Sequence, residues 1–143
     1  MDGSYKVLEH TADVGIEVVG TDFAETLEKA SEGLSSIMVN MKEIENFEIK
    51  DIFLEADDEE LLVVKWLNEI LFYFDSESFV CKKVEVKEIK KCDESYKIQG
   101  LFFGKCFDQK EDTMLVHVKA VTYHQLSVIT EKDNVMIKVF FDI

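Results

Sequence analysis

The stretch that decides the fold is DDEELLVVKWLNEILFYF, residues 57–74. Its apolar side chains recur at the three- and four-residue spacing of one helical face, which predicts an amphipathic helix with a wide buried stripe. The four acids at its start favour the positive end of such a helix, and Asp57 or Asp58 is expected to cap it. We prefer this capping role to a metal site. The predicted apolar face comprises Leu61, Val64, Leu67, Leu71 and Phe74, with Trp66 and Ile70 alongside.

A second amphipathic helix is predicted before it, over residues 22–40. Thr21 or Asp22 has the side chain of an N-cap, and the apolar residues that follow repeat at helical spacing. They are Phe23, Leu27, Ala30, Leu34 and Ile37 or Met38.

The remaining segments alternate apolar and polar residues, as half-buried strands do. Residues 10–13 are expected to form the turn between the first two strands, and a slip of the alternation is expected near Asp51. The longest run, residues 113–128, is predicted to be a central strand, and polar turns are predicted at 91–94 and 131–134. The expected strands are 5–9, 14–19, 47–54, 79–89, 96–103, 113–128 and 135–141.

These elements predict an α+β fold in which both helices pack on a mostly antiparallel mixed β-sheet. Neither helix can bury its apolar face alone, and a sheet offers the simplest complementary surface. The chain has 143 residues, 47% of them hydrophobic, with no proline, repeat or low-complexity segment. We therefore expect residues 1–143 to form a single compact domain.

No signal peptide is evident, and the apolar runs are far shorter than the roughly 20 residues of a membrane span. A soluble, cytoplasmic protein without membrane contact is expected. The three cysteines, Cys81, Cys92 and Cys106, are odd in number and show no CxxC spacing. This pattern argues against a disulfide framework or a zinc site and favours incidental thiols.

Charge is distributed unevenly along the chain. Residues 1–78 hold 20 acids and 5 lysines, whereas residues 79–143 hold 10 acids and 11 lysines. All sixteen basic residues are lysines, so the bidentate arginine contacts common in nucleic-acid recognition are missing. Tight direct binding to RNA or DNA is therefore not expected. A basic protein partner or a divalent cation fits the charge better, although acidity also serves solubility.

Acidic groups stand at both ends of the chain, in HTADVGI at residues 10–16 and in the final pair Asp142 and Ile143. Asp142 lies one residue before the terminal carboxylate. Asp13 would complete an oxygen-rich cation site if the fold brings the ends together. Crowded carboxylates raise one another's pKa, and a divalent ion relieves that repulsion. Taken alone, Asp13 fits a loop or turn acid equally well, and Ile143 fits a buried aliphatic end.

Four blocks in order resemble the archease family across essentially the whole chain. They are EHTADVGI at residues 9–16, LLVVKWLNEIL at 61–71, VKAVTYH at 118–124 and the terminal DI at 142–143. The resemblance implies a partner of the tRNA-splicing RNA ligase, which joins 3′-phosphate or 2′,3′-cyclic-phosphate ends to 5′-hydroxyl ends. The implied role is to promote ligase guanylylation and multiple turnover without catalysing ligation, with tRNA met only indirectly.

The resemblance also implies a metal site formed by Asp13, Asp142 and Ile143, with Ca²⁺ as the first candidate and Mg²⁺ or Mn²⁺ as alternatives. His10, Lys119 and His124 are supporting candidates that fit structural roles equally well. Gly104 is followed by Lys105 where the family pattern has an acid. This departure weakens any role for an acid at that position.

Two other functions remain open. A stand-alone metal-dependent hydrolase would need a catalytic group, yet no HExxH, GxSxG, P-loop or dinucleotide motif is present. A general chaperone-like protein-binding module differs from the ligase activator mainly in the breadth of its partners. Phosphoester or nucleotide turnover by the protein alone would distinguish the enzyme from both binding roles.

Overall fold

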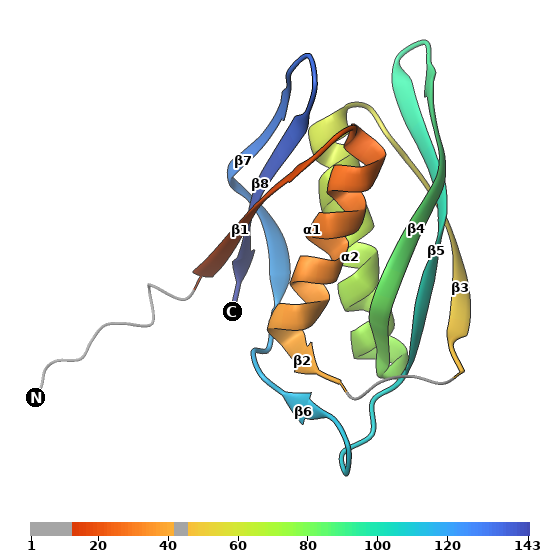
Figure 1. Ribbon diagram of the computed structural model, residues 1–143, viewed down its shortest axis with the longest axis vertical. Coiled ribbons are helices and arrows are strands. Elements are labelled where there is room, and N and C mark those ends of the chain that lie inside the picture. Colours follow the sequence, from red (N-terminus) through yellow and green to blue (C-terminus); the bar gives the residue numbers. More distant parts are fainter. Residues whose placement is uncertain (1–12, 42–45) are drawn as a thin grey trace, which may run out of the picture.

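The computed structural model describes residues 13–41 and 46–143. Within them the chain forms two helices and eight strands, in an order that interleaves the two kinds (Figure 1). The predicted strand at residues 5–9 and most of the predicted turn at 10–13 lie outside the described residues. The elements are β1 (Asp13–Gly20), α1 (Phe23–Met38), β2 (Val39–Asn40), β3 (Glu48–Ala56), α2 (Glu59–Glu77), β4 (Phe79–Cys92), β5 (Ser95–Cys106), β6 (Thr113–Met114), β7 (Ala120–Thr130) and β8 (Val135–Asp142).

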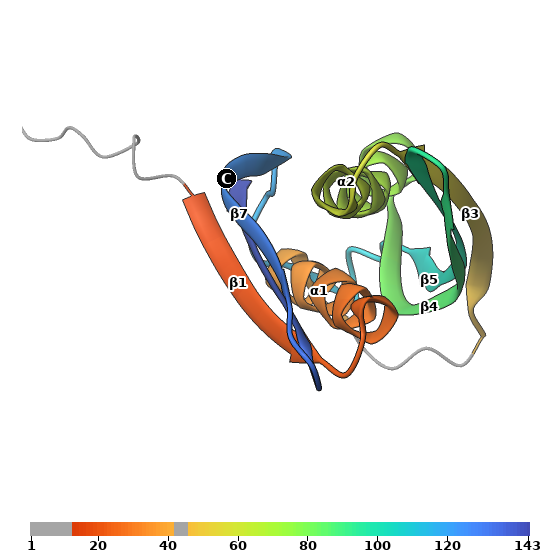
Figure 2. The same ribbon diagram turned by 90° about the horizontal axis from the view of Figure 1, so that it is seen from above.

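The strands form two three-stranded sheets, ordered β1-β8-β7 and β3-β5-β4, and a short ribbon of β2 with β6. All strand pairs of the described residues are antiparallel. Figure 2 shows both helices between the two larger sheets. The predicted α+β class is confirmed, but the single mixed sheet is corrected to two separate antiparallel sheets, because the helices need an apolar partner on each side.

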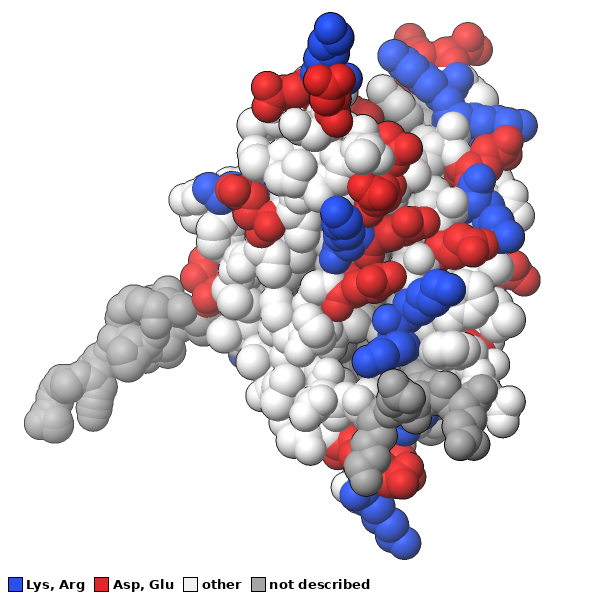
Figure 3. Space-filling model, viewed as in Figure 1, with Lys and Arg blue, Asp and Glu red and all other residues white. Residues whose placement is uncertain are grey.

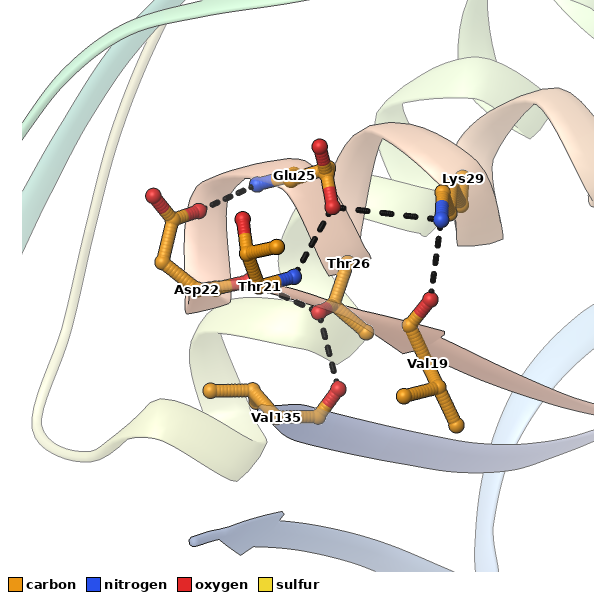
Figure 4. A network of polar contacts seen from close by, with 7 residues as sticks. All are labelled: Val19, Thr21, Asp22, Glu25, Thr26, Lys29 and Val135. Carbon is orange, nitrogen blue, oxygen red and sulfur yellow. Dashed lines mark hydrogen bonds and ion pairs between the residues drawn. The ribbon is translucent and has the colours of Figure 1, made fainter. Parts of the chain in front are cut away.

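Helix α1 begins where the sequence predicts, with Asp22 as its N-cap. The Asp22 carboxylate accepts a hydrogen bond from the Glu25 backbone N–H at 2.8 Å, and the Glu25 carboxylate accepts one from the Thr21 N–H at 2.8 Å (Figure 4). This reciprocal arrangement satisfies two free N–H groups at the helix start. The cap therefore fixes the direction in which α1 leaves β1.

Two side chains of α1 tie the helix to the first sheet. The Thr26 hydroxyl donates to the Val135 carbonyl of β8 at 2.9 Å, and the Lys29 ammonium donates to the Val19 carbonyl of β1 at 3.0 Å (Figure 4). Thr26 is fully buried, so its bond is shielded from water. These contacts hold β1 and β8 against the same helix.

Helix α2 fills the space between the sheets. Asp58 is its N-cap and accepts from the Leu61 N–H at 2.8 Å, which confirms the predicted capping role. Trp66 is fully buried, and its indole N–H donates to the Ser31 hydroxyl of α1 at 2.9 Å. Its ring meets Phe102 of β5 edge-on at 5.1 Å between centroids. The stretch that predicted the fold thus joins α1 to the second sheet.

The outer edge of β4 is covered by α1. The Glu28 carboxylate accepts from the Val86 N–H at 2.8 Å, and that of Glu32 makes a long contact of 3.5 Å with the Val84 N–H. Figure 3 shows acidic and lysine side chains interleaved over this side of the molecule. Covering an edge strand in this way discourages pairing with another chain.

The predicted strand at 113–128 is confirmed in part, as β6 and β7, but its continuity and its central position are wrong. Residues 115–119 form no strand, and β7 lies at the edge of its sheet while β8 is central. The alternating pattern misleads because the chain here crosses from the ribbon to the first sheet, with the Leu115 N–H bonded to the Met38 carbonyl at 2.9 Å. The predicted slip near Asp51 is also wrong, because β3 pairs with β5 in continuous register.

No helix among the described residues is long and apolar enough to cross a membrane. The three cysteines are free thiols, as predicted, with Cys81 buried and Cys92 and Cys106 exposed. Burial raises the pKa of Cys81 to about 12, with the charge of Glu32 as a smaller cause. The Cys81 thiol is therefore protonated at neutral pH and a poor nucleophile.

Candidate metal centre

The two ends of the described chain meet in the first sheet. Strand β1 pairs with β8 so that Asp13 stands directly opposite Asp142, and Ala120 of β7 stands on the other side of Asp142. The Lys119 N–H donates to the Asp142 carbonyl at 2.8 Å. The predicted requirement that the last strand run beside the segment containing Asp13 is confirmed. Figure 1 shows the C-terminus beside the start of β1.

The register places both carboxylates on one face of the sheet. Side chains directly opposite in an antiparallel pair have Cβ atoms about 5 Å apart and point to the same side. Asp13 and Asp142 are both exposed, and neither carboxylate has a hydrogen-bond or ion-pair partner among the described residues. Within residues 13–41 and 46–143, no side chain competes with a cation for these oxygens.

The side chain of Ile143 is half-buried and packs against the hydrophobic core. This packing fixes the chain end immediately after Asp142. No group of three His, Cys, Asp or Glu side chains in the described parts of the chain is placed to hold a metal. The predicted third donor, the α-carboxylate of Ile143, stays a prediction. Oxygen donors of this kind suit a hard cation such as Ca²⁺ or Mg²⁺.

Asp13 and Asp142 together are called the acid pair. The supporting candidates predicted from the sequence differ in their position relative to it. His10 lies outside the described residues. Lys119 adjoins the pair through its backbone, and its side chain is exposed. His124 lies where the register of β7 against β8 is interrupted, and its ring meets that of Phe140 edge-on at 6.0 Å between centroids. The sheet therefore brings Lys119 to the acids and His124 to an aromatic neighbour.

Sequence reasoning missed the row of residues next to the acids. Gly15 of β1 stands opposite Phe140 of β8, and Thr122 of β7 follows on the other side. A Cβ atom at Gly15 would stand 2.6 Å from a carbon of the Phe140 ring, so the ring lies across the glycine and would have to shift for any larger residue. The available signal was a glycine inside a predicted strand, which often marks such a close approach.

A shallow hollow of about 200 Å³ lies beside this ring, with Gly15, Ile16, Glu17, Lys138 and Phe140 as its lining. The Lys138 ammonium stands 5.8 Å from the ring centroid, within the range of a cation–π contact. Glu17 faces Lys138 across the strands. The acid pair thus borders an apolar hollow with charged groups at its far side.

A larger pocket of about 380 Å³ is built by other elements, chiefly the end of α1, β2 and the start of β4. Its floor includes Ser35 and the protonated Cys81 thiol. It contains none of the predicted site residues. The predicted metal site and this pocket are therefore separate places on the molecule.

Comparison with known proteins links this geometry to one family. The family model described as the Archease protein family (MTH1598/TM1083) matches residues 5–143. Protein archease of Methanosarcina barkeri is 31% identical over 139 residues, covering 97% of this chain and 95% of the relative. Protein archease of Pyrococcus abyssi is 33% identical over 120 residues, 84% of each chain.

Solved structures agree in fold. The solution structure of protein 1598 from Methanobacterium thermoautotrophicum matches with a TM-score of 0.77 and 24% identity, over 97% of this chain and 96% of that one. The crystal structure of a Thermotoga maritima archease, described as a possible chaperone, matches with a TM-score of 0.62 and 22% identity over the full length of both. Because the family model spans nearly the whole sequence, this chain belongs to the archease family.

Proposed function

We propose that this protein is a metal-binding activator of the tRNA-splicing RNA ligase that joins 3′-phosphate or 2′,3′-cyclic-phosphate ends to 5′-hydroxyl ends. In this role it promotes guanylylation of the ligase and allows multiple turnovers, and it performs no ligation itself. Membership of the archease family supports the proposal. The observation that carries it is the pairing of Asp13 with Asp142 beside the chain end.

In the proposed metal site, some residues supply the ligands and others hold those ligands in place. Asp13 and Asp142 offer carboxylates held at fixed spacing by the strand register. The bond from the Lys119 N–H fixes the backbone of Asp142, and the packed side chain of Ile143 holds the terminal carboxylate nearby. A bound divalent ion would offset most of the charge of these acids and offer open coordination positions to oxygen groups of the ligase.

The charge of the chain favours a protein partner over direct contact with tRNA. The net charge is −14 and the chain contains no arginine, so the phosphate backbone would be repelled rather than bound. A ligase with a basic surface around its nucleotide site would be attracted to the same acids. We place the acid pair against that face of the ligase.

Single- and multiple-turnover ligation with purified ligase tests the proposal. Wild-type protein should accelerate ligase guanylylation and sustain repeated turnovers, whereas Asp13→Ala and Asp142→Ala should each lose most of this stimulation. Asp133→Ala, an exposed acid in the turn between β7 and β8, is the matched control and should stimulate fully. Full stimulation by both site variants would refute the metal-site role.

A broader chaperone-like role is the second candidate, favoured by an apolar area on the outer face of the second sheet. Phe53 and Ile49 are 66% and 57% exposed, and Ile49 shares this face with Phe103. The Thermotoga maritima relative is described as a possible chaperone. Suppression of aggregation of several unrelated unfolded proteins would favour this role, whereas an effect on the ligase alone supports the activator.

A further inference from the structure

We propose that the Phe140 ring and the carboxylates around it form a docking site for an arginine side chain of the basic protein partner. The inference rests on the proposed function, because it takes the partner to be the ligase. The partner inserts a guanidinium group, and Phe140 with the surrounding carboxylates receives it.

The Phe140 ring has the His124 ring as an edge-on neighbour, at 6.0 Å between centroids. The close approach to Gly15 leaves the ring lying across β1 without a side chain beneath it. The hollow of about 200 Å³ lies beside the ring, and the ring itself is only half-buried. The Lys138 ammonium stands near the edge of cation–π range, 5.8 Å from the centroid. The ring is therefore already oriented to receive a positive charge.

Carboxylates flank the Phe140 ring on both sides along the sheet. Asp13 and Asp142 form the row before Phe140, and Glu17 belongs to the row after it. Successive residues on one face of a strand lie about 7 Å apart, so a planar group stacked on Phe140 has acids within reach at either end. None of the three carboxylates has a partner among the described residues.

An arginine fits these features better than the alternatives. Its guanidinium stacks on aromatic faces, is weakly hydrated and pairs bidentately with carboxylates, whereas lysine is a compact and strongly hydrated charge. A nucleobase would bring its phosphate against three acids and a terminal carboxylate. This chain contains no arginine, so a second copy cannot supply one. The occupant comes from a different protein.

The Lys138 side chain moves away from the ring when an arginine docks. When the guanidinium stacks on Phe140, the ammonium leaves the ring and moves toward Glu17, which faces it across the strands. The net charge of Asp13, Asp142, Glu17, Lys138 and the terminal carboxylate is negative, and it stays negative with one divalent ion bound. Metal binding and arginine docking are therefore compatible.

The direct test is a nitrogen–proton NMR titration of the full chain with three capped tripeptides, acetyl-Gly-Arg-Gly-amide and its lysine and citrulline counterparts. The arginine peptide should shift the amide signals of Gly15, Lys138 and Phe140, with an affinity at least about fivefold above that of the lysine peptide. Citrulline, which has the same shape without charge, should not bind. Equal binding of all three peptides, or shifts only with guanosine monophosphate, would overturn the inference.

Variants separate this site from the metal site. Phe140→Leu should remove the preference for arginine and weaken ligase binding about tenfold, while Ca²⁺ affinity stays unchanged. Phe140→Tyr should keep both properties, and Met136→Leu on the same strand is the control. If the wild type fails to bind the ligase yet prefers the arginine peptide, the proposed function fails and the arginine site stands. If Phe140→Leu binds ligase and peptide like the wild type, the arginine site fails alone.

Discussion

The indole N–H of Trp66 is buried and donates a hydrogen bond to the Ser31 hydroxyl. Ser31→Ala removes that acceptor and leaves a buried donor unsatisfied. We expect the free energy of unfolding to fall by about 1–3 kcal/mol. Urea unfolding monitored by tryptophan fluorescence measures it. Ser36→Ala, at an exposed hydroxyl of the same helix, is the control, and equal stability of both variants would contradict the prediction.

Lys50 joins β3 to the end of α2 through a 2.7 Å contact with Glu77, and its ammonium stands 5.4 Å and 5.3 Å from the rings of Tyr73 and Phe79. The hydrogen bond to Glu77 raises the pKa of Lys50 above its ordinary value of 10.5. Because a raised lysine pKa stabilises the fold only while the group is protonated, this contribution is complete at neutral pH and disappears as pH rises through the folded pKa.

Lys50→Met should therefore unfold at a lower temperature than the wild type at pH 7, and the difference between the two should shrink above pH 10.5. Thermal unfolding followed by circular dichroism across this range measures the effect. Lys132→Met, at an exposed lysine in the turn between β7 and β8, provides the comparison. A difference that grows with pH would have the wrong sign for this explanation.

At the scale of single residues, the sequence predicts Asp13 and Asp142 as site residues but does not predict the role of Phe140 beside them. Asp13 and Asp142 could be proposed because both stand near recognisable chain ends, and their pairing follows if the end strands are adjacent. Phe140 could not be linked to Gly15 from the sequence, because that contact depends on the exact register of β1 against β8. Cation binding by Asp13, Asp142 and Ile143 stays a prediction.

At the scale of elements, helix α2 offers a matched pair of acids at its start. Asp58 accepts the Leu61 N–H, whereas the neighbouring Asp57 is exposed and precedes the cap. Asp58→Ala should reduce the free energy of unfolding by about 1 kcal/mol, because one N–H of the first turn loses its acceptor. Asp57→Ala should have a smaller effect. Chemical denaturation of both variants measures this, and a larger loss for Asp57→Ala would contradict the assigned cap.

The helices were predictable and the sheet arrangement was not. Apolar spacing and capping side chains are local signals, so α1 and α2 were placed to within a few residues. Sheet order depends on contacts between distant segments. Residues 115–119 alternate like a strand, yet they form a crossover because the chain must pass from the β2–β6 ribbon to the edge of the first sheet. The division into two sheets follows from the positions of both helices, which no local pattern reveals.

At the scale of the whole molecule, the acidic surface should guide binding to the ligase. Charge steering weakens with salt because the screening length falls from about 10 Å at 0.1 M to about 3 Å at 1 M. We expect the affinity for the ligase to fall at least about tenfold over this range, measured by biolayer interferometry. An affinity that is unchanged or stronger at 1 M salt would indicate an apolar contact, such as the outer face of the second sheet, as the main interface.

The central claim is that the two ends of the chain form one cation site, and a calorimetric Ca²⁺ titration tests it most directly. The wild type should bind one ion, Asp13→Ala and Asp142→Ala should each weaken binding at least about tenfold, and the double variant should add little to either. One residue added after Ile143 should weaken binding as well, because it displaces the terminal carboxylate. Asp133→Ala should bind like the wild type. Unchanged Ca²⁺ affinity in both Asp13→Ala and Asp142→Ala would contradict the account.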